Sequence, residues 1–379
     1  MKFNKEKAAY IAPTVVTILM IITLILIPTG FEDNEIYKGA ERSVVKVLST
    51  DESSIIDTGL VRSGEQTCTV EILNGIFKGR TASAVNILSG SLEQDKLYSI
   101  NDKALAVISY SDEEILTITM TDHYRINWEA VLAALFAVVL IAFAGRTGVR
   151  SVMSFILTIL ALWKLVVPLY LKGFNPIIVG GFFTIVLSVM IVSLVYGFDK
   201  RALAASLGIT AGVAVTAVLG IIFTSVFKIH GAVMSYSESL LYSGYQYLNL
   251  TQIFMASIFM GASGAVMDLA VDITSAINEV AHKKPDISRI ELIKSGLNVG
   301  RSAMGTITTT LLLAYSGSCI ALLMVFMAQG TPLDNILNYK YVAAEIVHTI
   351  VGSFGLVFAA PLTALTGGIL LANGEQTKK

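Results

Sequence analysis

The chain has 379 residues, of which 54% are hydrophobic and only 15% are charged. A soluble globular protein has about 25% charged residues, so this composition excludes an ordinary water-soluble surface. The 27 basic and 28 acidic residues give a net charge of −1, so no general basic field exists to hold nucleic acid. The class must be read from the long apolar stretches, and these indicate an integral membrane protein.

Eight stretches have the length of about 20 apolar residues that a membrane span needs. They cover residues 8–27, 128–144, 151–171, 177–196, 203–227, 253–276, 305–327 and 343–371. The basic start MKFNKEK resembles a signal peptide, but no A-x-A cleavage site follows, so we expect an uncleaved anchor helix in residues 1–30. The expected fold is an α-helical polytopic membrane protein with a seven-helix membrane domain over 128–372 and a tail over 373–379.

The distribution of Lys and Arg predicts the orientation of these spans. Loops on the side of the N-terminus carry fourteen Lys and Arg residues, including Arg146 and Arg150, whereas the opposite short loops carry three. Cytoplasmic loops carry the excess of basic residues. We therefore expect both termini, with the tail 373–379, in the cytoplasm and residues 31–127 outside the membrane.

The segment 31–127 is the only sizeable soluble region, and its pattern predicts β structure. Alternation places Cys68, Val70 and Ile72 on one face of a strand, and residues 116, 118 and 120 repeat the pattern. Turn signals such as Asn74-Gly75 separate the runs. Five or six short strands suggest a small barrel, of which the oligonucleotide/oligosaccharide-binding type is one candidate. A ligand-binding module and an inert cap remain equally open.

Two other segments are amphipathic rather than spanning. The outer loop 228–251 contains four tyrosines, which suits a helix at the level of the lipid headgroups. The inner segment 286–300 gathers apolar residues near one side and basic residues that suit the anionic inner leaflet. In both cases a connector resting on the membrane is the favoured interpretation.

The span 253–276 carries the strongest constellation of polar residues. At helical spacing it presents a stripe of polar and small residues: Ser257, Gly261, Gly264, Asp268, Asp272, Ser275 and Glu279. Glycines allow another helix to approach closely. Asp268 and Asp272 lie one turn apart, and two carboxylates that close do not easily both ionise in a low dielectric, so they suit a proton or cation site. The alternative is a helix end that already enters water.

Other intramembrane polar residues extend this hypothesis of a substrate or ion pathway. Lys164 lies near the middle of its span, with Asp268 or Glu345 as a candidate partner and snorkelling as the alternative. Glu345 and His348 lie one turn apart in the last span, and Thr306 and Thr309 either line a path or bond to their own helix. A separate set of glycines at four-residue spacing, including Gly208 and Gly212, predicts helix packing only.

Three segments together resemble the YibE/F family of bacterial membrane proteins. They are GASGAVMDLAVDITSAINE (261–279), GRSAMGTITTTLLLAYSG (300–317) and EIVHTIVGSFGLVFAAPLTALTGG (345–368). The soluble stretch VEILNGIFKGRTASAVNIL (70–88) is similar to that family's outer segment. The resemblance implies a multi-pass fold in the bacterial plasma membrane with a large outer domain, and it implies no particular activity.

The residues favour a secondary transporter or permease for a small solute or cation. A membrane-anchored scaffold or sensor acting through the barrel is the alternative, and a channel is another. No P-loop, Ser-His-Asp order or H-E-x-x-H motif occurs, and both intramembrane aspartates share one helix, so we expect neither an enzyme nor a cofactor. Cys68 and Cys319 fall in different regions and predict neither a disulfide nor a thiolate zinc site, and whether a metal binds elsewhere is left open. The expected partners are lipid and either a second copy or a homologous membrane protein, but no nucleic acid.

Overall fold

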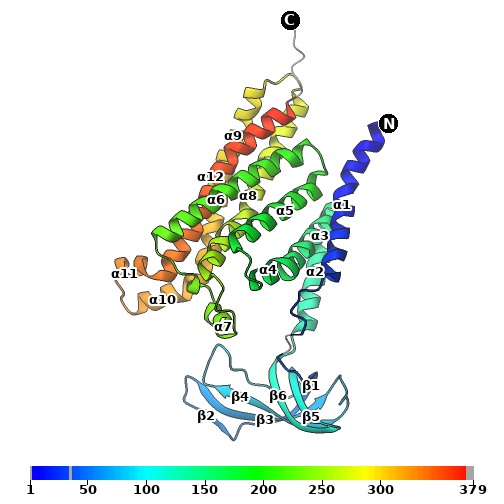
Figure 1. Ribbon diagram of the computed structural model, residues 1–379, viewed down its shortest axis with the longest axis vertical. Coiled ribbons are helices and arrows are strands. Elements are labelled where there is room, and N and C mark those ends of the chain that lie inside the picture. The colour runs from blue at the N-terminus through cyan, green and yellow to red at the C-terminus, as the bar shows by residue number, and fades with distance from the viewer. Residues whose placement is uncertain (1, 34–35, 373–379) are drawn as a thin grey trace. The chain divides into compact units, whose positions relative to one another are not determined.

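The computed structural model describes residues 2–33 and 36–372, with side chains from residue 9 onward. It contains two compact units, which are Phe31–Val139 and the combination of Met1–Gly30 with Leu140–Lys379. The expected tail 373–379 lies outside the described residues. Figure 1 shows the strands of the first unit and the helices of the second.

The first unit contains a small barrel, as the alternation predicted. Its strands are β1 Ala40–Asp51, β2 Ile55–Asp57, β3 Arg62–Ile72, β4 Thr81–Ser89, β5 Lys103–Ser111 and β6 Glu114–His123. The pairings run β1-β5-β6-β4-β3, and β3 pairs again with β1, so that five strands close into a ring. The β4–β6 pairing is parallel and the others are antiparallel, with β2 added as a short strand on β3.

The barrel core contains the predicted face of β3. Cys68, Val70 and Ile72 are fully buried there, in one apolar cluster with Ile118. Leu116 departs from the expected alternation and is exposed. The register between β5 and β6 shifts next to this residue, because Ser109 is opposite Thr117 while Tyr110 is opposite Ile115. Such a bulge leaves one residue unpaired and redirects its side chain.

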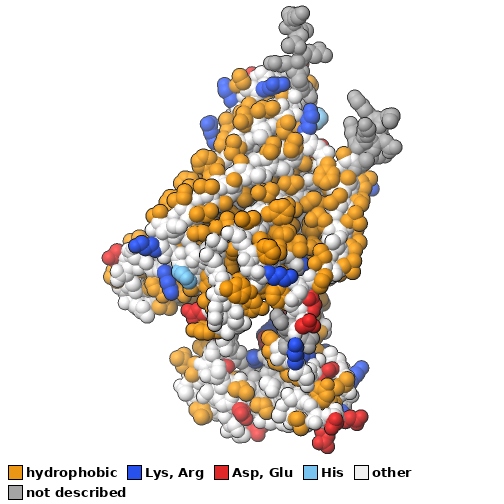
Figure 2. Space-filling model, in the orientation of Figure 1, with side chains coloured by type: hydrophobic (Ala, Val, Ile, Leu, Met, Phe, Trp, Pro, Cys, Tyr) orange, Lys and Arg blue, Asp and Glu red, His pale blue; other side chains and the backbone are white. Residues whose placement is uncertain are grey.

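Among the described residues, eight helices are long and apolar enough to cross a membrane. They are α1 Lys2–Leu26, α2 Ile126–Ala144, α3 Arg146–Ala161 with η1 Leu162–Val166 and α4 Val167–Leu171, α5 Pro176–Tyr196, α6 Lys200–Val226, α8 Leu250–Lys283, α9 Arg289–Ser316 with η3 Gly317–Cys319 and α10 Ile320–Ala328, and α12 Lys340–Leu371. These helices agree closely with the predicted spans and are compatible with a polytopic helical membrane protein. Figure 2 shows apolar side chains over the flank of the helical unit, with Lys and Arg at the helix ends.

The core of the helical unit is built around α8 and α12. Helix α12 packs on α6, α8 and α9, while α8 also packs on α5 and α6. Helix α1 packs on α3 and α5 at the periphery. Small residues permit the close α6–α12 contact, since a Cβ on Gly208 would collide with Thr363 and one on Gly212 would lie 2.8 Å from the Cβ of Ala359. By contrast, no residue of α2, which is described throughout, is buried.

The two segments predicted to be amphipathic differ in secondary structure. Residues 286–300 do not form a separate connector, because α9 begins at Arg289 with Ser288 as its N-cap and continues without interruption to Ser316. Ser288 and Glu291 form a capping box that fixes this start. The loop 228–251 is not one continuous helix, and its position at the membrane surface remains a prediction. It contains only the short helices η2 Gly231–Val233 and α7 Ser237–Tyr242.

Candidate functional site

The exposed face of α8 consists of polar residues and glycines. Between Leu250 and Ala281, the exposed residues of this helix are Gly261, Gly264, Asp268, Asp272, Ser275 and Glu279. They are the residues of the stripe predicted from the sequence, except for Ser257, which is half-buried. The opposite face is apolar and includes Val266, Leu269 and Ile273, which are fully buried in the core. The apolar face anchors the helix in the bundle and thereby fixes where the polar face points.

The exposed faces of α5 and α6, two of the helices that pack on α8, differ from that of α8. Helix α6 exposes large apolar residues such as Leu203, Leu207 and Val218. Helix α5 likewise exposes Ile178 and Phe182. Apolar side chains of this kind suit contact with lipid, whereas carboxylates at membrane depth require water or a polar partner. The α8 face is therefore distinguished from lipid-facing surface by its chemistry.

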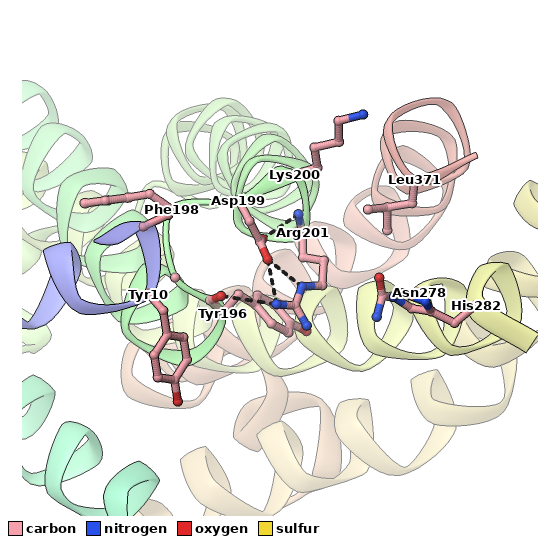
Figure 3. A pocket seen from close by; sticks show the side chains of 11 residues that line it. Tyr10, Tyr196, Phe198, Asp199, Lys200, Arg201, Asn278, His282 and Leu371 are labelled. Carbon is pink, nitrogen blue, oxygen red and sulfur yellow. Dashed lines mark hydrogen bonds and ion pairs between the residues drawn. The ribbon is translucent and has the colours of Figure 1, made fainter. Parts of the chain in front are cut away.

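One end of the polar face joins a cavity through Ser275. The Tyr196 hydroxyl from the end of α5 lies 2.7 Å from the Ser275 hydroxyl and 2.7 Å from the carbonyl oxygen of Val271. Tyr196 lines a cavity of about 540 Å³ that also involves α1, α8 and α12. Asn278 and His282, which continue along α8 by one turn each, line the same cavity (Figure 3).

An ion pair shapes this cavity at the α5–α6 turn. Arg201 Nη2 lies 2.6 Å from Asp199 Oδ2, and Arg201 Nε donates to the same oxygen at 2.7 Å. Arg201 Nη2 also donates to the carbonyl of Tyr196 at 3.3 Å. Figure 3 shows Lys200 extending away from this pair, while Asn278 and His282 lie across from it. Polar and charged residues at the opening of this cavity allow water to reach the end of the α8 face.

The other end of the polar face joins a cluster contributed by α9 and α12. Ser257 Oγ lies 3.1 Å from His348 Nε2, so the predicted residue His348 contacts α8 directly. A Cβ on Gly261 would lie 2.5 Å from the Tyr315 hydroxyl, so this glycine provides the space that the tyrosine occupies. The segment of α8 from Ser257 to His282 is about 37 Å long at a rise of 1.5 Å per residue. This length exceeds the thickness of the hydrocarbon core of a bilayer, which is about 30 Å.

Tyr315 and Ser318 belong to this cluster but were missed as site residues in the sequence. Ser318 Oγ donates to Glu345 Oε1 at 3.4 Å, and the Tyr315 ring stacks on His348 with centroids 5.0 Å apart. Both residues lie where α9 gives way to the 3-10 turn η3. The sequence Tyr-Ser-Gly-Ser hints at this 3-10 turn, because a glycine between two serines lowers the helix propensity. Residue spacing alone does not show that the α-helix ends there.

Lys164 does not meet either predicted carboxylate partner. Its Nζ donates to the carbonyl oxygen of Ile27 at 3.2 Å, and no ion pair involves it among the described residues. The lysine sits in the π-helical turn η1, four residues before Pro168. Proline removes a backbone donor and clashes with the carbonyl four residues earlier, which explains the widened turn. The lysine thus holds the end of α1 rather than neutralising Asp268.

The other residues predicted from the sequence have separate environments. Thr306 and Thr309 are exposed, and their hydroxyls bond to the carbonyls of Ala303 and Gly305 in their own helix, as one of the two interpretations expected. Gly264 has no heavy atom within 4 Å of an added Cβ, so within the described chain no helix approaches it. Glu279, at the end of the stripe, forms an exposed ion pair with Lys283 at 2.9 Å.

Asp268 and Asp272 have no hydrogen-bond or ion-pair partner among the residues that the structure describes. The same residues contain no group of three or more His, Cys, Asp or Glu side chains that could hold a metal ion. The two carboxylates therefore lie on one face, one turn apart, and no cationic side chain of the described part of the chain pairs with them. Such a pair can take up a proton or bind a cation from a water-filled path.

The helical unit resembles a known protein family. The chain matches the family model of YibE/F-like proteins over residues 132–373, which includes every helix from α3 to α12. Neither the curated proteins nor the solved structures gave a match. Since the matched region covers well over half of the sequence, the chain belongs to the YibE/F-like family.

Proposed function

We propose that this protein is an integral membrane secondary transporter, or permease, that moves a small solute or cation along the polar face of α8. The observation that carries the proposal is the composition of that face. Every exposed residue between Leu250 and Ala281 is polar or glycine, whereas exposed residues of α5 and α6 are mostly apolar. The face runs from Ser257, beside His348, to Ser275, beside Tyr196 and the cavity.

The energetic argument rests on the two aspartates. A charged side chain at the centre of a membrane helix costs about 2.5–3.5 kcal/mol even on the mildest insertion scale. Asp268 and Asp272 both lie on the exposed side of α8, so direct contact with lipid would be doubly unfavourable. A water-filled path along the face removes this cost. Gly264, which lies one turn before Asp268 and has open space around it, leaves room for such a path.

Carboxylates one turn apart also suit ion exchange. Their mutual repulsion is relieved when one of them binds a proton or when both share a cation. The absence of a basic partner among the described residues leaves this compensation to the transported or coupling ion. We assign the coupling step to Asp268, with Asp272 as its electrostatic neighbour.

The test is proton flux into proteoliposomes loaded with a pH-sensitive dye, under an imposed membrane potential and with inorganic cations supplied in turn. Asp268→Asn keeps the shape of the side chain and removes its charge. We expect this variant to lower flux at least tenfold while its amount in the membrane stays unchanged. Asp286→Asn, in the exposed turn before α9, is the matched control and should transport normally.

Full flux through Asp268→Asn would exclude the aspartate as the coupling group. Loss of the variant from the membrane would instead show a structural role, such as contact with a second membrane protein that covers the face. Leu269→Asn distinguishes these outcomes. Leu269 is fully buried in the core, so an unpaired amide there should lower abundance and flux together.

A membrane-anchored sensor is the second candidate, and one feature of the barrel favours it. A cavity of about 380 Å³ lies between the turn after β2 and the loop after β4. Leu60 and Leu92 line it although they are 77% and 74% exposed. Exposed leucines around a hollow are typical of a binding surface. Loss of cellular activity in Leu60→Ser and Leu92→Ser, with full activity in Asp268→Asn, would support this function instead of transport.

A further inference from the structure

The break between α9 and α10 contains buried polar atoms that the transport path along α8 does not use. The Oε2 atom of Glu345 and the hydroxyl of Tyr315 are both buried, and neither has a hydrogen-bond partner among the described residues. Ser318 reaches only the other carboxylate oxygen, Oε1. A buried polar atom without a partner costs about 1–3 kcal/mol, and more when it is charged.

The side chains around these atoms are held in place. The His348 ring lies between Tyr315, stacked at an interplanar angle of 18°, and Phe254, whose centroid is 5.3 Å away. His348 Nε2 is engaged with the hydroxyl of Ser257. Gly261 leaves the space in which the Tyr315 hydroxyl sits. The Tyr315 hydroxyl therefore belongs to a ring that is held in place, and the other oxygen of Glu345 is in contact with Ser318.

The donor set identifies the class of ligand. It contains one carboxylate, from Glu345, and the hydroxyls of Tyr315 and Ser318, all of which are hard oxygen ligands. Oxygen donors of this type suit alkali and alkaline-earth cations rather than soft transition metals. Calcium takes six to eight oxygen ligands, and Mg²⁺ demands a near-ideal octahedron and usually keeps several waters. One carboxylate balances the whole charge of a monovalent cation but only half that of a divalent one. The set thus fits a monovalent cation.

We propose that Glu345, Tyr315 and Ser318 form a binding site for a monovalent cation, with Na⁺ as the ligand, at the 3-10 turn η3 between α9 and α10. Glu345 lies on α12, Tyr315 in the last turn of α9 and Ser318 in η3, so the ligands come from two helices. Binding here would also join α9 to α12 through the cation. The site is separate from the carboxylates of Asp268 and Asp272, so it does not depend on whether the α8 face transports.

The experiment measures thermal unfolding of the full chain in detergent as Na⁺ replaces choline at constant ionic strength. A ligand that binds only the folded protein raises the midpoint temperature, Tm, as its concentration exceeds the dissociation constant. We expect Na⁺ to raise the Tm of the wild type by a few degrees. Glu345→Gln should abolish that rise, and Tyr315→Phe and Ser318→Ala should each reduce it. The readout is the response to Na⁺ within each variant, so a changed basal Tm does not affect it.

Two control variants complete the design. Glu238→Gln removes an exposed acid from α7, and Thr309→Val removes an exposed hydroxyl from α9, so both should respond to Na⁺ as the wild type does. No Na⁺ response in the wild type, or an undiminished response in Glu345→Gln, would overturn the proposal. If Glu345→Gln does not fold, an undiminished response in both Tyr315→Phe and Ser318→Ala overturns it equally. A response lost in Asp268→Asn but kept in Glu345→Gln would place the cation on α8 instead.

Discussion

At the scale of single residues, the charge of a side chain did not reveal its environment. Arg146 and Arg150 count equally in the distribution of basic residues, yet Arg146 is exposed and Arg150 is only 9% exposed. The Arg150 guanidinium donates to the carbonyls of Leu194 at 3.1 Å and Tyr10 at 2.8 Å, and it stacks 3.7 Å above the Tyr10 ring. It thereby connects α3 to the end of α5 and to α1.

Arg150→Met should consequently destabilise the bundle, whereas Arg146→Met should not. Methionine preserves much of the aliphatic stem but removes the donors to two carbonyls, and hydrogen bonds from a charged group contribute about 1.5–3 kcal/mol each. The expected result is a lower Tm for Arg150→Met in detergent, with Arg146→Met within about 0.5 kcal/mol of the wild type. Equal stability of the two variants would show that the guanidinium is dispensable.

Cys68 gives a residue-scale prediction in the barrel. Burial raises the pKa of its thiol from 9.0 to about 11, because the thiolate loses its solvation, and Glu52 adds repulsion. Two pKa units lower the thiolate fraction at pH 8 about 100-fold. Alkylation of Cys68 by iodoacetamide at pH 8 should thus be at least 100-fold slower in the folded protein than in urea.

The same shift has a consequence for stability. A folded-state pKa above the unfolded value means that folding retains the proton, so this contribution is complete below pH 9 and declines as the pH rises toward 11. Unfolding of the barrel should become easier over that range, and Cys68→Ala should respond less. Fast alkylation of the folded protein at pH 8 would contradict the buried, protonated thiol.

At the scale of the elements, long apolar runs located the spans and helical spacing located the α8 stripe, because both are local properties of the sequence. Asp268 and Asp272 were assigned to one face by spacing alone, and that assignment needs no knowledge of other helices. Contacts between distant segments were not accessible in this way. Lys164 was paired with Asp268 only because both are intramembrane charges, whereas its actual partner is the carbonyl of Ile27. A backbone acceptor carries no signature in a sequence.

Two glycines that looked alike in the sequence should behave differently when a methyl group is added. A Cβ on Gly212 would lie 2.9 Å from Val266 Cγ1 and 3.0 Å from the carbonyl oxygen of Gly355, so Gly212→Ala overpacks the α6–α12 contact. Overpacking typically costs about 1–3 kcal/mol. Gly264→Ala meets nothing within 4 Å and gains helix propensity, so it should be neutral or stabilising.

Thermal unfolding of both variants in the same detergent checks this difference. Equal loss of stability would mean that Gly264 is covered in the membrane by something outside the described chain. Normal stability of Gly264→Ala combined with lost proton flux would instead show that the open space beside Asp268 is needed for transport.

At the scale of the whole molecule, the barrel and the helical bundle are separate compact units. Each unit could be predicted from its own pattern of apolar residues. Alternation at every second residue produced the barrel, and long apolar runs produced the helices. The orientation of the spans relative to the two sides of the membrane follows from another property, the distribution of Lys and Arg. It remains a prediction, because charge bias acts during insertion and leaves no mark on the packing of the helices.

We expect both termini and the α5–α6 turn to face the cytoplasm, with the barrel and the short helix α11 Leu333–Asn338 outside. Single cysteines introduced at Ser91, in the barrel, and at Asp334, in α11, should react in intact cells with a maleimide that cannot cross the membrane. A cysteine at Lys200, which is exposed in the α5–α6 turn, should react only after the cells are opened. The unmodified chain gives the background from Cys68 and Cys319. Labelling at Lys200 in intact cells would reverse the orientation, and the cavity beside Tyr196 would then open outward rather than toward the cytoplasm.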